Sequence, residues 1–307
     1  MDEIIITAGA LYADIDVFAC TLAYRQLLCI KGINSTAVLA GPLNESVTAT
    51  VKKWKSPYEK AVGGSSDEHK FILVDISDPK YFPSYVIEEN IIELFDHRAG
   101  YEEYWKDKLG DKAHIELVGA CATQIWNEFK EANSHKEISS NNANLLYTAI
   151  LSNTLNLYSQ NTTEKDKQAL VELEKYTLLP ENWRENYFSE VSTAIYASPE
   201  KAMKNDTKHV EIRGESYAII QTELWNSKEF VNKHINLIKS LLTQLGDRHT
   251  FFTSPSISEG INYLISQNVA TKLLLTGALG AIFDGDVGKT NKLWLRKEII
   301  KVLVEGS

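Results

Sequence analysis

Three consecutive polar side chains, Asp96, His97 and Arg98, follow the apolar run 91–95. An acid, an imidazole and a guanidinium that come directly after a strand lie at one edge of a sheet, where α/β proteins bind their ligands. A charged turn with a solvated His97 would have the same sequence, so the triplet alone does not decide between a site and a turn. The acidic residues upstream favour a site.

Two earlier predicted strands are also followed by carboxylates. The run 4–7 precedes Asp14 and Asp16, and the apolar run 71–74 ends at Asp75. A helix N-cap explains one carboxylate of the first pair but not both, and a carboxylate at the end of a buried strand is costly to desolvate unless it is paired or binds a metal. Oxygen ligands with one imidazole suit Mn²⁺ or Mg²⁺ better than zinc. The sequence therefore predicts a divalent-cation site at the rim of a parallel sheet.

Two further segments each have a binding and a packing interpretation. Gly119 to Thr123 opens a predicted helix, and its small residues either leave backbone N–H groups free for a phosphate or allow close helix packing. Asn153 lies inside the apolar run 149–157, where its amide is either a ligand or a hydrogen-bonded core group. The sequence leaves both alternatives open.

Composition restricts the class of protein. The 307 residues are enough for two domains, and 44% hydrophobic with 24% charged residues is typical of a folded chain. The net charge of −9 opposes binding of a long nucleic acid. The three cysteines form no CxxC pair, and no apolar run approaches the roughly 20 residues of a membrane span. We therefore expect a cytoplasmic protein that does not enter a membrane.

A change of composition near residue 188 predicts a domain boundary there. Residues 1–188 would form a parallel-sheet domain, and residues 189–307 a smaller α/β domain that carries Lys208, Arg296 and Lys297. The elements predicted in the second domain are a hairpin over 208–221, a helix over 227–245, and strands near 250 and over 273–275. The basic residues alone would be interpreted as solvated surface.

These motifs together resemble the DHH phosphoesterase superfamily, in the branch with a DHHA2-type C-terminal domain. That branch contains the manganese-dependent (family II) inorganic pyrophosphatases, the exopolyphosphatases and the prune proteins. The matching segments are 9–16, 73–75, 96–98, 119–123, 150–157, 206–208 and 296–297. The resemblance implies a two-domain α/β fold with the site between the domains, and hydrolysis of a phosphoanhydride.

The sequence departs from the family pattern at three positions. Ala10 stands where the pyrophosphatases have a metal-binding histidine, Arg98 replaces the last histidine of the DHH motif, and Asn153 replaces an aspartate. The resemblance therefore implies a weakened first metal site and a second site that is nearly complete.

The resemblance assigns a role to each matching residue. Asp14 and Asp75 would hold the first ion, and Asp16, Asp75, His97 and Asn153 the second, with Mn²⁺, Mg²⁺ or Co²⁺ as the metal. Arg98, Lys208, Arg296 and Lys297 would bind the substrate phosphates. Because Arg98 cannot donate a proton as the missing histidine would, and general acids contribute about 10²–10⁴-fold, we expect a slower enzyme than a true pyrophosphatase.

Three functions are compatible with this sequence. The first is a hydrolase of pyrophosphate, short polyphosphate or a nucleotide polyphosphate, with Asp75, His97 and Arg98 in the catalytic centre. The alternative is a degenerate relative that binds phosphate compounds or a partner without turnover. A nuclease is disfavoured, because Gly63-Gly64-Ser65 lies in the wrong half for the GGGH motif of that group and lacks its histidine. A homodimer through the edge of the first sheet is a further expectation from the resemblance.

Overall fold

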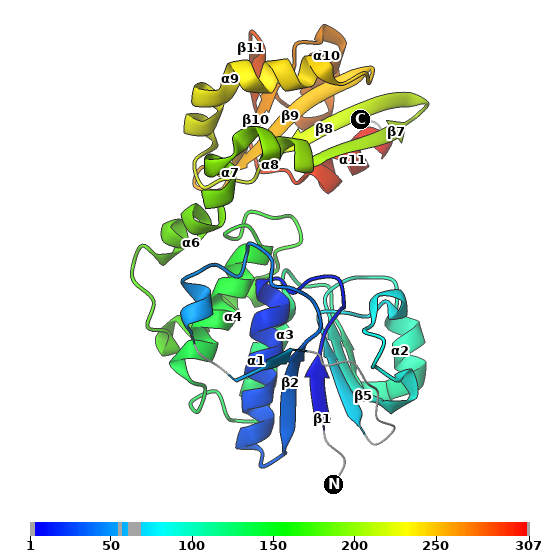
Figure 1. The fold of residues 1–307 in the computed structure, drawn as a ribbon, viewed down its shortest axis with the longest axis vertical. Coiled ribbons are helices and arrows are strands. Elements are labelled where there is room, and N and C mark those ends of the chain that lie inside the picture. Colours follow the sequence, from blue (N-terminus) through cyan, green and yellow to red (C-terminus); the bar gives the residue numbers. More distant parts are fainter. Residues whose placement is uncertain (1–3, 55–56, 61–68, 306–307) are drawn as a thin grey trace. The chain divides into compact units, whose positions relative to one another are not determined.

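The computed structural model describes residues 4–54, 57–60 and 69–305, and Gly63-Gly64-Ser65 lies outside these ranges (Figure 1). The chain forms two compact units. The first comprises Met1–Leu157 and Asn161–Trp183, and the second comprises Tyr158–Gln160 and Arg184–Ser307. Each unit contains a six-stranded sheet with helices, which confirms the predicted fold class of two α/β domains.

The first unit is built on a parallel sheet with the strand order β3-β2-β1-β4-β5-β6. Its strands are β1 (Ile4–Thr7), β2 (Ser35–Leu39), β3 (Glu59–Lys60), β4 (Lys70–Val74), β5 (Ile91–Asp96) and β6 (Ala113–Ile115). β4 pairs in parallel with both β1 and β5. The carboxyl ends of these three strands therefore lie side by side at one rim, where the predicted acidic residues follow them.

Helices cover both faces of this sheet, which explains why β4 is apolar along its length. On one face Trp105 of α2 (Glu102–Leu109) packs with Phe71 and Leu94. On the other, the Tyr24 ring of α1 (Ile15–Ile30) lies 4.9 Å from the ring of Phe95. Two further helices, α3 (Cys121–Glu131) and α4 (Ser140–Asn153), pack on α1 and on each other. Helix α5 (Glu164–Leu173) packs on α3 and α4. Thr163 and Asp166 form the capping box of α5.

The second unit has a mixed sheet with the order β11-β12-β10-β9-β8-β7, in which β8 and β9 are parallel and the other pairs antiparallel. Its strands are β7 (Thr207–Ile212), β8 (Glu215–Gln221), β9 (His249–Ser256), β10 (Ile261–Ile265), β11 (Ile282–Asp284) and β12 (Val287–Lys289). Its helices are α6 (Trp183–Val191), whose first residue belongs to the first unit, α7 (Thr193–Ala197), α8 (Pro199–Asn205), α9 (Ser227–Gln244), α10 (Val269–Leu279) and α11 (Arg296–Glu305).

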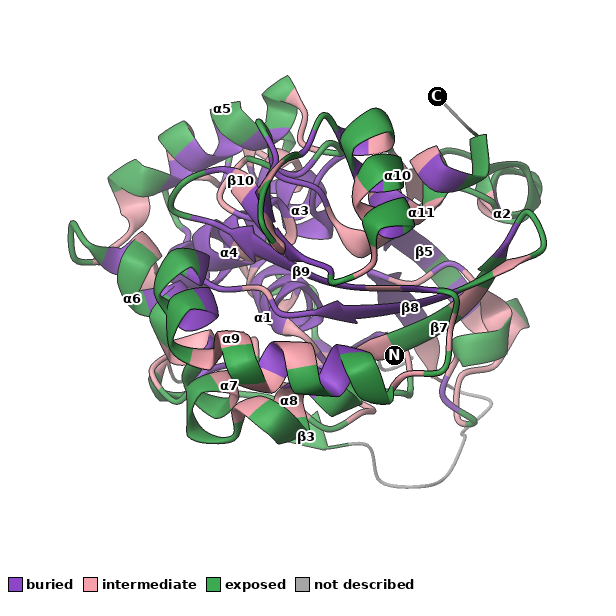
Figure 2. Ribbon diagram, turned by 90° about the horizontal axis from the view of Figure 1, so that it is seen from above, coloured by how far each residue is buried: buried purple, intermediate pink, exposed green. Residues whose placement is uncertain are grey.

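Alternate residues of β8 and β9 face opposite helical layers. Ile220 and Phe252 join the core under α9, while Ile219 and Phe251 join the core with α10 and α11. Figure 2 shows these central strands buried, whereas the edge strand β7 is largely exposed or half-buried. The predicted hairpin, the helix near 227–245 and the strand near 250 are confirmed.

The strand predicted over 273–275 is wrong, because these residues lie in α10. Asn268 caps this helix by accepting a hydrogen bond from the N–H of Thr271, and Gly280 ends it with a left-handed φ of 64°. Leu275 is buried while Leu273 and Leu274 are 69% and 40% exposed. A short apolar run does not distinguish a strand from a helix that leaves some leucines on the surface.

Two expectations from composition concern membranes and disulfides. Among the described residues, no helix has the length and apolar character needed to cross a bilayer. Cys20 and Cys121 are buried and Cys29 is exposed, and all three are free thiols.

Candidate metal centre

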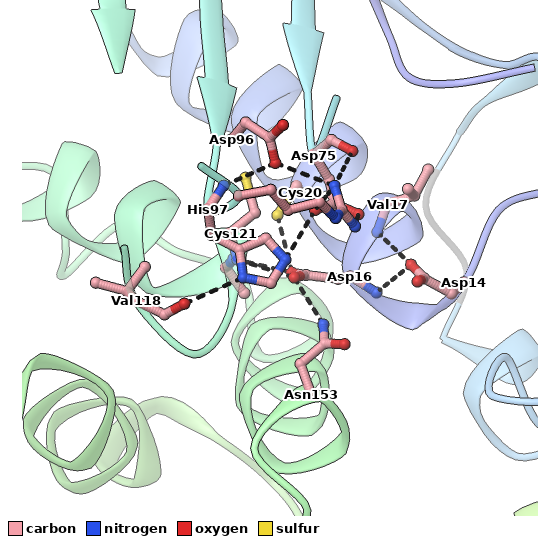
Figure 3. Close-up of polar contacts among 12 residues, drawn as sticks. Asp14, Asp16, Val17, Cys20, Asp75, Asp96, His97, Val118, Cys121 and Asn153 are labelled. Atoms are coloured by element: carbon pink, nitrogen blue, oxygen red, sulfur yellow. Dashed lines mark hydrogen bonds and ion pairs between the residues drawn. The ribbon is translucent and has the colours of Figure 1, made fainter. Parts of the chain in front are cut away.

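The predicted acidic residues converge at the rim of the first sheet (Figure 3). Asp75 directly follows β4, Asp96 ends β5, and Asp14 and Asp16 lie at the start of α1. With His97 and Arg98 they form a group that we call the rim cluster, consisting of Asp14, Asp16, Asp75, Asp96, His97 and Arg98. The two neighbours of β4 in the sheet therefore explain why residues far apart in sequence meet here.

The carboxylate of Asp16 is fixed by the first turn of α3. It accepts hydrogen bonds from the backbone N–H groups of Cys121 and Ala122 at 2.8 and 2.9 Å. N–H groups at a helix start have no partner within the helix and favour negative charge. Asp16 is fully buried in this position.

The same contacts decide between the two interpretations of Gly119 to Thr123. The N–H groups of Cys121 and Ala122 bind Asp16, and the Gly119 N–H donates to Asp166 Oδ2 at 2.9 Å. A Cβ on Gly119 would lie only 2.5 Å from the Thr154 side chain. These three N–H groups are therefore not free for a phosphate, and of the two open interpretations close packing accounts for the small residues.

His97 is oriented by a backbone carbonyl. Its Nδ1 lies 3.1 Å from the carbonyl oxygen of Val118, so Nε2 points at Asp75 Oδ1, 3.3 Å away. Metal-binding histidines commonly have their second nitrogen held in this way. Burial disfavours the imidazolium, but the nearby Asp75 carboxylate and the other acids outweigh it and raise the pKa of His97 to about 9.

Asp75 combines an unusual backbone with a buried oxygen. Its φ is 56°, in the left-handed region that few residues other than glycine adopt and that often occurs at functional sites. Its Oδ1 is buried and accepts no hydrogen bond of good geometry from any described residue, although His97 and Arg98 lie within ion-pair distance. A buried carboxylate oxygen of this kind suits a cation.

These ligand atoms are close enough for one ion. One atom each from Asp16, Asp75 and His97 lies within 4.8 Å of the others. Two carboxylates and an imidazole fit Mn²⁺ and related ions. The residues present therefore fit the metal that the sequence predicted at this position.

Burial and crowding of acids shift the pKa values of the rim cluster. Desolvation first, and then the charge of Asp75, raise the pKa of Asp16 to about 7 and that of Asp14 to about 6. Desolvation acts on Asp75 in the same direction, but Arg98 and His97 outweigh it and lower its pKa. The protein's own cations thus stabilise one of the three carboxylates and leave the other two short of positive charge.

Asn153, the last residue of α4, also reaches this cluster. Its Nδ2 donates a hydrogen bond to Asp16 Oδ2 at 2.7 Å. The amide nitrogen, not the oxygen, thus faces the carboxylate. Coordination by Asn153 would require a half-turn of the amide.

Asp14 and Ala10, the positions predicted for a first metal site, do not belong to the ligand group of Asp16, Asp75 and His97. Oδ1 of Asp14 caps α1 by accepting from the N–H groups of Asp16 and Val17 at 3.1 and 3.0 Å. Ala10 is exposed and has no side-chain donor atom.

Arg98 donates to Asp75 Oδ2 at 3.1 Å and to Asp96 Oδ1 at 3.0 Å, with about half of its side chain exposed.

The sequence placed Asp96 at the predicted site without assigning it a role, and the structure shows that it organises the cluster. Its carboxylate accepts from Ser77 Oγ at 2.5 Å, from the N–H of His97 at 2.7 Å and from Arg98. The sequence shows that Asp96 lies between a strand and His97. Only the pairing of β4 with β5 shows that its side chain points into the rim cluster.

The predicted phosphate-binding residues lie in the second unit. Lys208 is exposed on β7, Arg296 begins α11, and Lys297 follows it at the surface. Arg296 binds the carboxylate of Asp206 at 2.6 Å and its carbonyl oxygen at 2.7 Å. Asp206 lies in the matching segment 206–208 but was assigned no role, and its contacts with Arg296 bring the start of α11 to the start of β7.

No family model matches the chain. A probable manganese-dependent inorganic pyrophosphatase of Lactobacillus delbrueckii subsp. bulgaricus is 32% identical over 163 residues, 53% of this chain and 51% of that relative. The matched region thus spans about half the length of that relative. A protein of the same name from Lactobacillus acidophilus is 25% identical over 230 residues, 74% of this chain and 73% of that relative. One from Oceanobacillus iheyensis is 24% identical over 306 residues, 95% of each chain.

Two solved structures share the fold. The putative family II inorganic pyrophosphatase of Methanococcus jannaschii has a TM-score of 0.59 at 19% identity and covers 99% of this chain and 100% of its own. An exopolyphosphatase-related protein of Bacteroides fragilis has a TM-score of 0.50 at 11% identity and covers 99% of this chain and 92% of its own. The relatives and the shared fold confirm the predicted resemblance to DHH phosphoesterases of the family II pyrophosphatase branch.

Proposed function

We infer that the protein is a manganese-dependent hydrolase that cleaves a phosphoanhydride bond in a small phosphate compound. The observation that carries this inference is the convergence of Asp16, Asp75 and His97 around the buried Oδ1 of Asp75. Relatives named manganese-dependent inorganic pyrophosphatase support both the metal and the reaction class.

Asp16, Asp75, His97 and, after rotation of its amide, Asn153 would hold the ion. A divalent ion in such a site polarises a phosphoryl oxygen and lowers the pKa of bound water. The Val118 carbonyl keeps His97 Nε2 directed at the ligand group, and the α3 N–H groups keep Asp16 in place. These contacts preorganise the ligands, which limits the entropy lost on binding.

The cationic residues would bind the substrate phosphates. Arg98 presents a half-exposed guanidinium at the rim cluster, and Lys208, Arg296 and Lys297 supply positive charge on the second unit. Positioned cations stabilise the charge that develops during phosphoryl transfer. We place the boundary between the two domains near residue 188.

A protein that binds phosphate compounds without turnover is the second candidate, because Ala10, Arg98 and Asn153 depart from the family pattern. Phosphate release from pyrophosphate, tripolyphosphate and a nucleoside tetraphosphate, with Mn²⁺, Mg²⁺ or Co²⁺, separates the two. We expect release with Mn²⁺ that Asp75→Asn abolishes and the exposed control Asp111→Asn keeps. Binding of pyrophosphate by calorimetry without release from any substrate would establish the second candidate.

We also expect the protein to work in the cytoplasm, as a homodimer formed through an edge of the first sheet. Both expectations rest on the composition and on the resemblance. Sedimentation at micromolar concentration tests the dimer, and a monomeric mass would contradict it.

A further inference from the structure

The carboxylate of Asp75 has different neighbours on its two sides. Oδ1 faces His97 Nε2 and the ligand group with Asp16. On the other side, Arg98 Nη2 donates to Oδ2 at 3.1 Å, and Nη1 donates to the backbone oxygen of the same residue at 2.8 Å. Arg98 Nη1 also lies 3.0 Å from Oδ1, so the guanidinium contacts both oxygens but hydrogen-bonds only to Oδ2. Oδ1 is therefore the oxygen left for a metal ion, and the guanidinium already binds Oδ2.

The guanidinium is held by more than Asp75. Arg98 Nη1 also donates to Asp96 Oδ1 at 3.0 Å, and Asp96 is fixed by Ser77 Oγ at 2.5 Å. Both carboxylates are buried. A planar guanidinium bound by two fixed carboxylates and a carbonyl loses several charge-assisted hydrogen bonds if it moves away.

A second divalent ion beside Asp75 would compete for these same atoms. It would need Asp75 Oδ2, which Arg98 binds, and it would sit next to the positive charge of the guanidinium. Asp14, the other carboxylate near that side, has its Oδ1 occupied by the N-cap of α1. Enzymes with two metal ions place them about 3.5–4 Å apart around shared ligands. Among the described residues, three candidate ligands gather at one place, formed by Asp16, Asp75 and His97, and this set suits one ion.

We propose that Arg98 takes the place of a second metal ion, so that the rim cluster binds one divalent ion at Asp75 Oδ1 and keeps the guanidinium hydrogen-bonded to Oδ2. This proposal deepens the proposed function but concerns the number of ions, which is measured without turnover. Arg98 then supplies a permanent positive charge whose presence does not depend on metal concentration.

The number of Mn²⁺ ions bound per chain tests the proposal. Equilibrium dialysis with Mn²⁺ alone, together with electron paramagnetic resonance, distinguishes an isolated ion from a coupled pair. We expect one isolated ion for the wild type and for Arg98→Lys, which keeps the charge. Arg98→Ala frees Asp75 Oδ2 and Asp96 Oδ1, and we expect it to bind a second ion.

Two results would overturn the proposal. A wild type that binds two coupled ions would show that the guanidinium yields to the metal. An Arg98→Ala protein that keeps its circular dichroism spectrum and still binds one ion would show that the guanidinium is not what excludes a second one. Neither readout depends on hydrolysis, so failure of the proposed function would be seen separately.

A second observation concerns the cleft beside the rim cluster. The cleft has a volume of about 400 Å³, and its lining includes Asp75 and Arg98 as well as Leu11, Tyr12, Tyr81 and Tyr101. Tyr12 and Tyr81 are 53% and 38% exposed. Clefts of roughly 300–1,000 Å³ with aromatic walls are typical of sites for organic ligands, whereas an inorganic phosphate chain has no apolar surface to bury.

The backbone holds these aromatic residues in place. The Ala10 N–H donates to the carbonyl oxygen of Tyr81 at 3.0 Å, and the Ala13 N–H donates to that of Pro42 at 2.8 Å. A Cβ on Gly41 would lie 2.6 Å from the Cα of Tyr12, so only glycine permits this close approach. Exposed aromatic rings on a fixed backbone can stack on a ligand at little entropic cost.

The geometry points to a nucleoside polyphosphate as the substrate class, with its base against the tyrosines and its phosphates toward Arg98. This inference rests on the proposed function. Adenosine triphosphate and inorganic tripolyphosphate form a matched pair, because they share a chain of phosphates and differ by the nucleoside. Tyr12→Ala tests the cleft, and Tyr104→Ala is the control, since Tyr104 is exposed on α2 and does not line the cleft.

We expect Tyr12→Ala to raise the KM for adenosine triphosphate about tenfold, as loss of base stacking does, and to leave the KM for tripolyphosphate unchanged. Equal KM changes for both compounds, or none, would contradict a nucleoside site. If neither compound is hydrolysed, binding replaces turnover as the readout, and the proposed function is judged separately by phosphate release from pyrophosphate. Calorimetry with Mn²⁺ and each compound then decides the cleft proposal by whether Tyr12→Ala weakens only nucleotide binding.

Discussion

Glu93 and Asp96 lie three residues apart on β5, both are buried, and their surroundings differ in charge. Glu93 accepts hydrogen bonds from Tyr24 at 2.5 Å and Lys112 at 2.8 Å, and His114 lies 3.3 Å away. Burial opposes its ionisation, but these partners lower its pKa to about 2. Around Asp96, the rim cluster instead contains acids with raised pKa values.

The difference shows which acids the chain neutralises by itself. Glu93 has enough donors of its own, and its network holds β5, β6 and α1 together. The rim cluster has four carboxylates against one guanidinium and one imidazole, and the pKa values of Asp14 and Asp16 rise to about 6 and about 7. A cluster that lacks positive charge and contains a buried oxygen without a hydrogen bond is a site for a cation, whereas a balanced network is structural.

The largest effect is expected for loss of a ligand in the rim cluster. Asp16→Asn removes a negative charge from the ligand group, and we expect Mn²⁺ affinity to fall by more than about 100-fold, the upper range for residues that only support a ligand. Calorimetry with Mn²⁺ measures the affinity. Glu93→Gln is the matched control, because it neutralises a buried acid outside the cluster. Equal losses of Mn²⁺ affinity in the two variants would contradict the distinction between a cation site and a structural network.

A smaller effect is expected at the phosphate-binding residues of the second unit. Arg296→Ala removes a guanidinium but no predicted metal ligand, so we expect a KM for pyrophosphate about tenfold higher, the equivalent of one charge-assisted hydrogen bond, with Mn²⁺ affinity unchanged. Lys301→Ala, an exposed residue of the same helix, serves as the control. Loss of Mn²⁺ binding in Arg296→Ala would contradict the assignment.

Glu93→Gln should affect stability and leave the rim cluster intact. Replacement of the carboxylate weakens bonds with three donors, which costs about 1–2 kcal/mol of unfolding free energy. Urea unfolding of both proteins gives the difference. An unchanged midpoint would mean that the network contributes little to stability.

The two regions should respond to pH with opposite signs. The folded pKa of Glu93, about 2, lies below the ordinary glutamate value of 4.5, so the contribution of Glu93 to stability is complete above pH 4.5 and is lost as pH falls toward 2. The folded pKa of Asp16, about 7, lies above the ordinary aspartate value of 3.8, so the metal-free protein gains stability as pH falls from 7 toward 4. Urea unfolding between pH 3 and pH 8, about the range of these shifts, compares the wild type with Glu93→Gln and Asp16→Asn. Glu93→Gln should remove the loss of stability at low pH, and Asp16→Asn should remove the gain of stability as pH falls from 7.

The sequence identified most of the rim cluster because its acids follow predicted strands. We inferred from strand ends alone that four residues converge, namely Asp14, Asp16, Asp75 and His97. The pairing of β4 with β1 and β5 places them together. The direction of Arg98 toward Asp75 was not predictable, since a half-exposed arginine can bind either a substrate or a neighbouring acid. The tyrosines of the cleft were missed because no residue pattern marks them as ligand-binding, although Tyr12 lies inside the matching segment 9–16.

Packing explains the other differences. The N–H groups of Cys121 and Ala122 bind Asp16 through a contact between α1 and α3 that no local pattern encodes. Residues 273–275 were assigned to a strand because their apolar run has no polar residue to reveal its period. The open choice at residues 119–123 and the wrong strand at 273–275 both concern positions where tertiary contacts, not local sequence, decide the outcome.

The most direct test of the central claim is phosphate release from pyrophosphate in the presence of Mn²⁺, measured side by side for the wild type, Asp75→Asn and Glu93→Gln. If the rim cluster binds the ion for hydrolysis, the wild type and Glu93→Gln release phosphate and Asp75→Asn does not. Release by Asp75→Asn at the wild-type rate would contradict the claim, because the reaction would then proceed without the residue at the centre of the cluster.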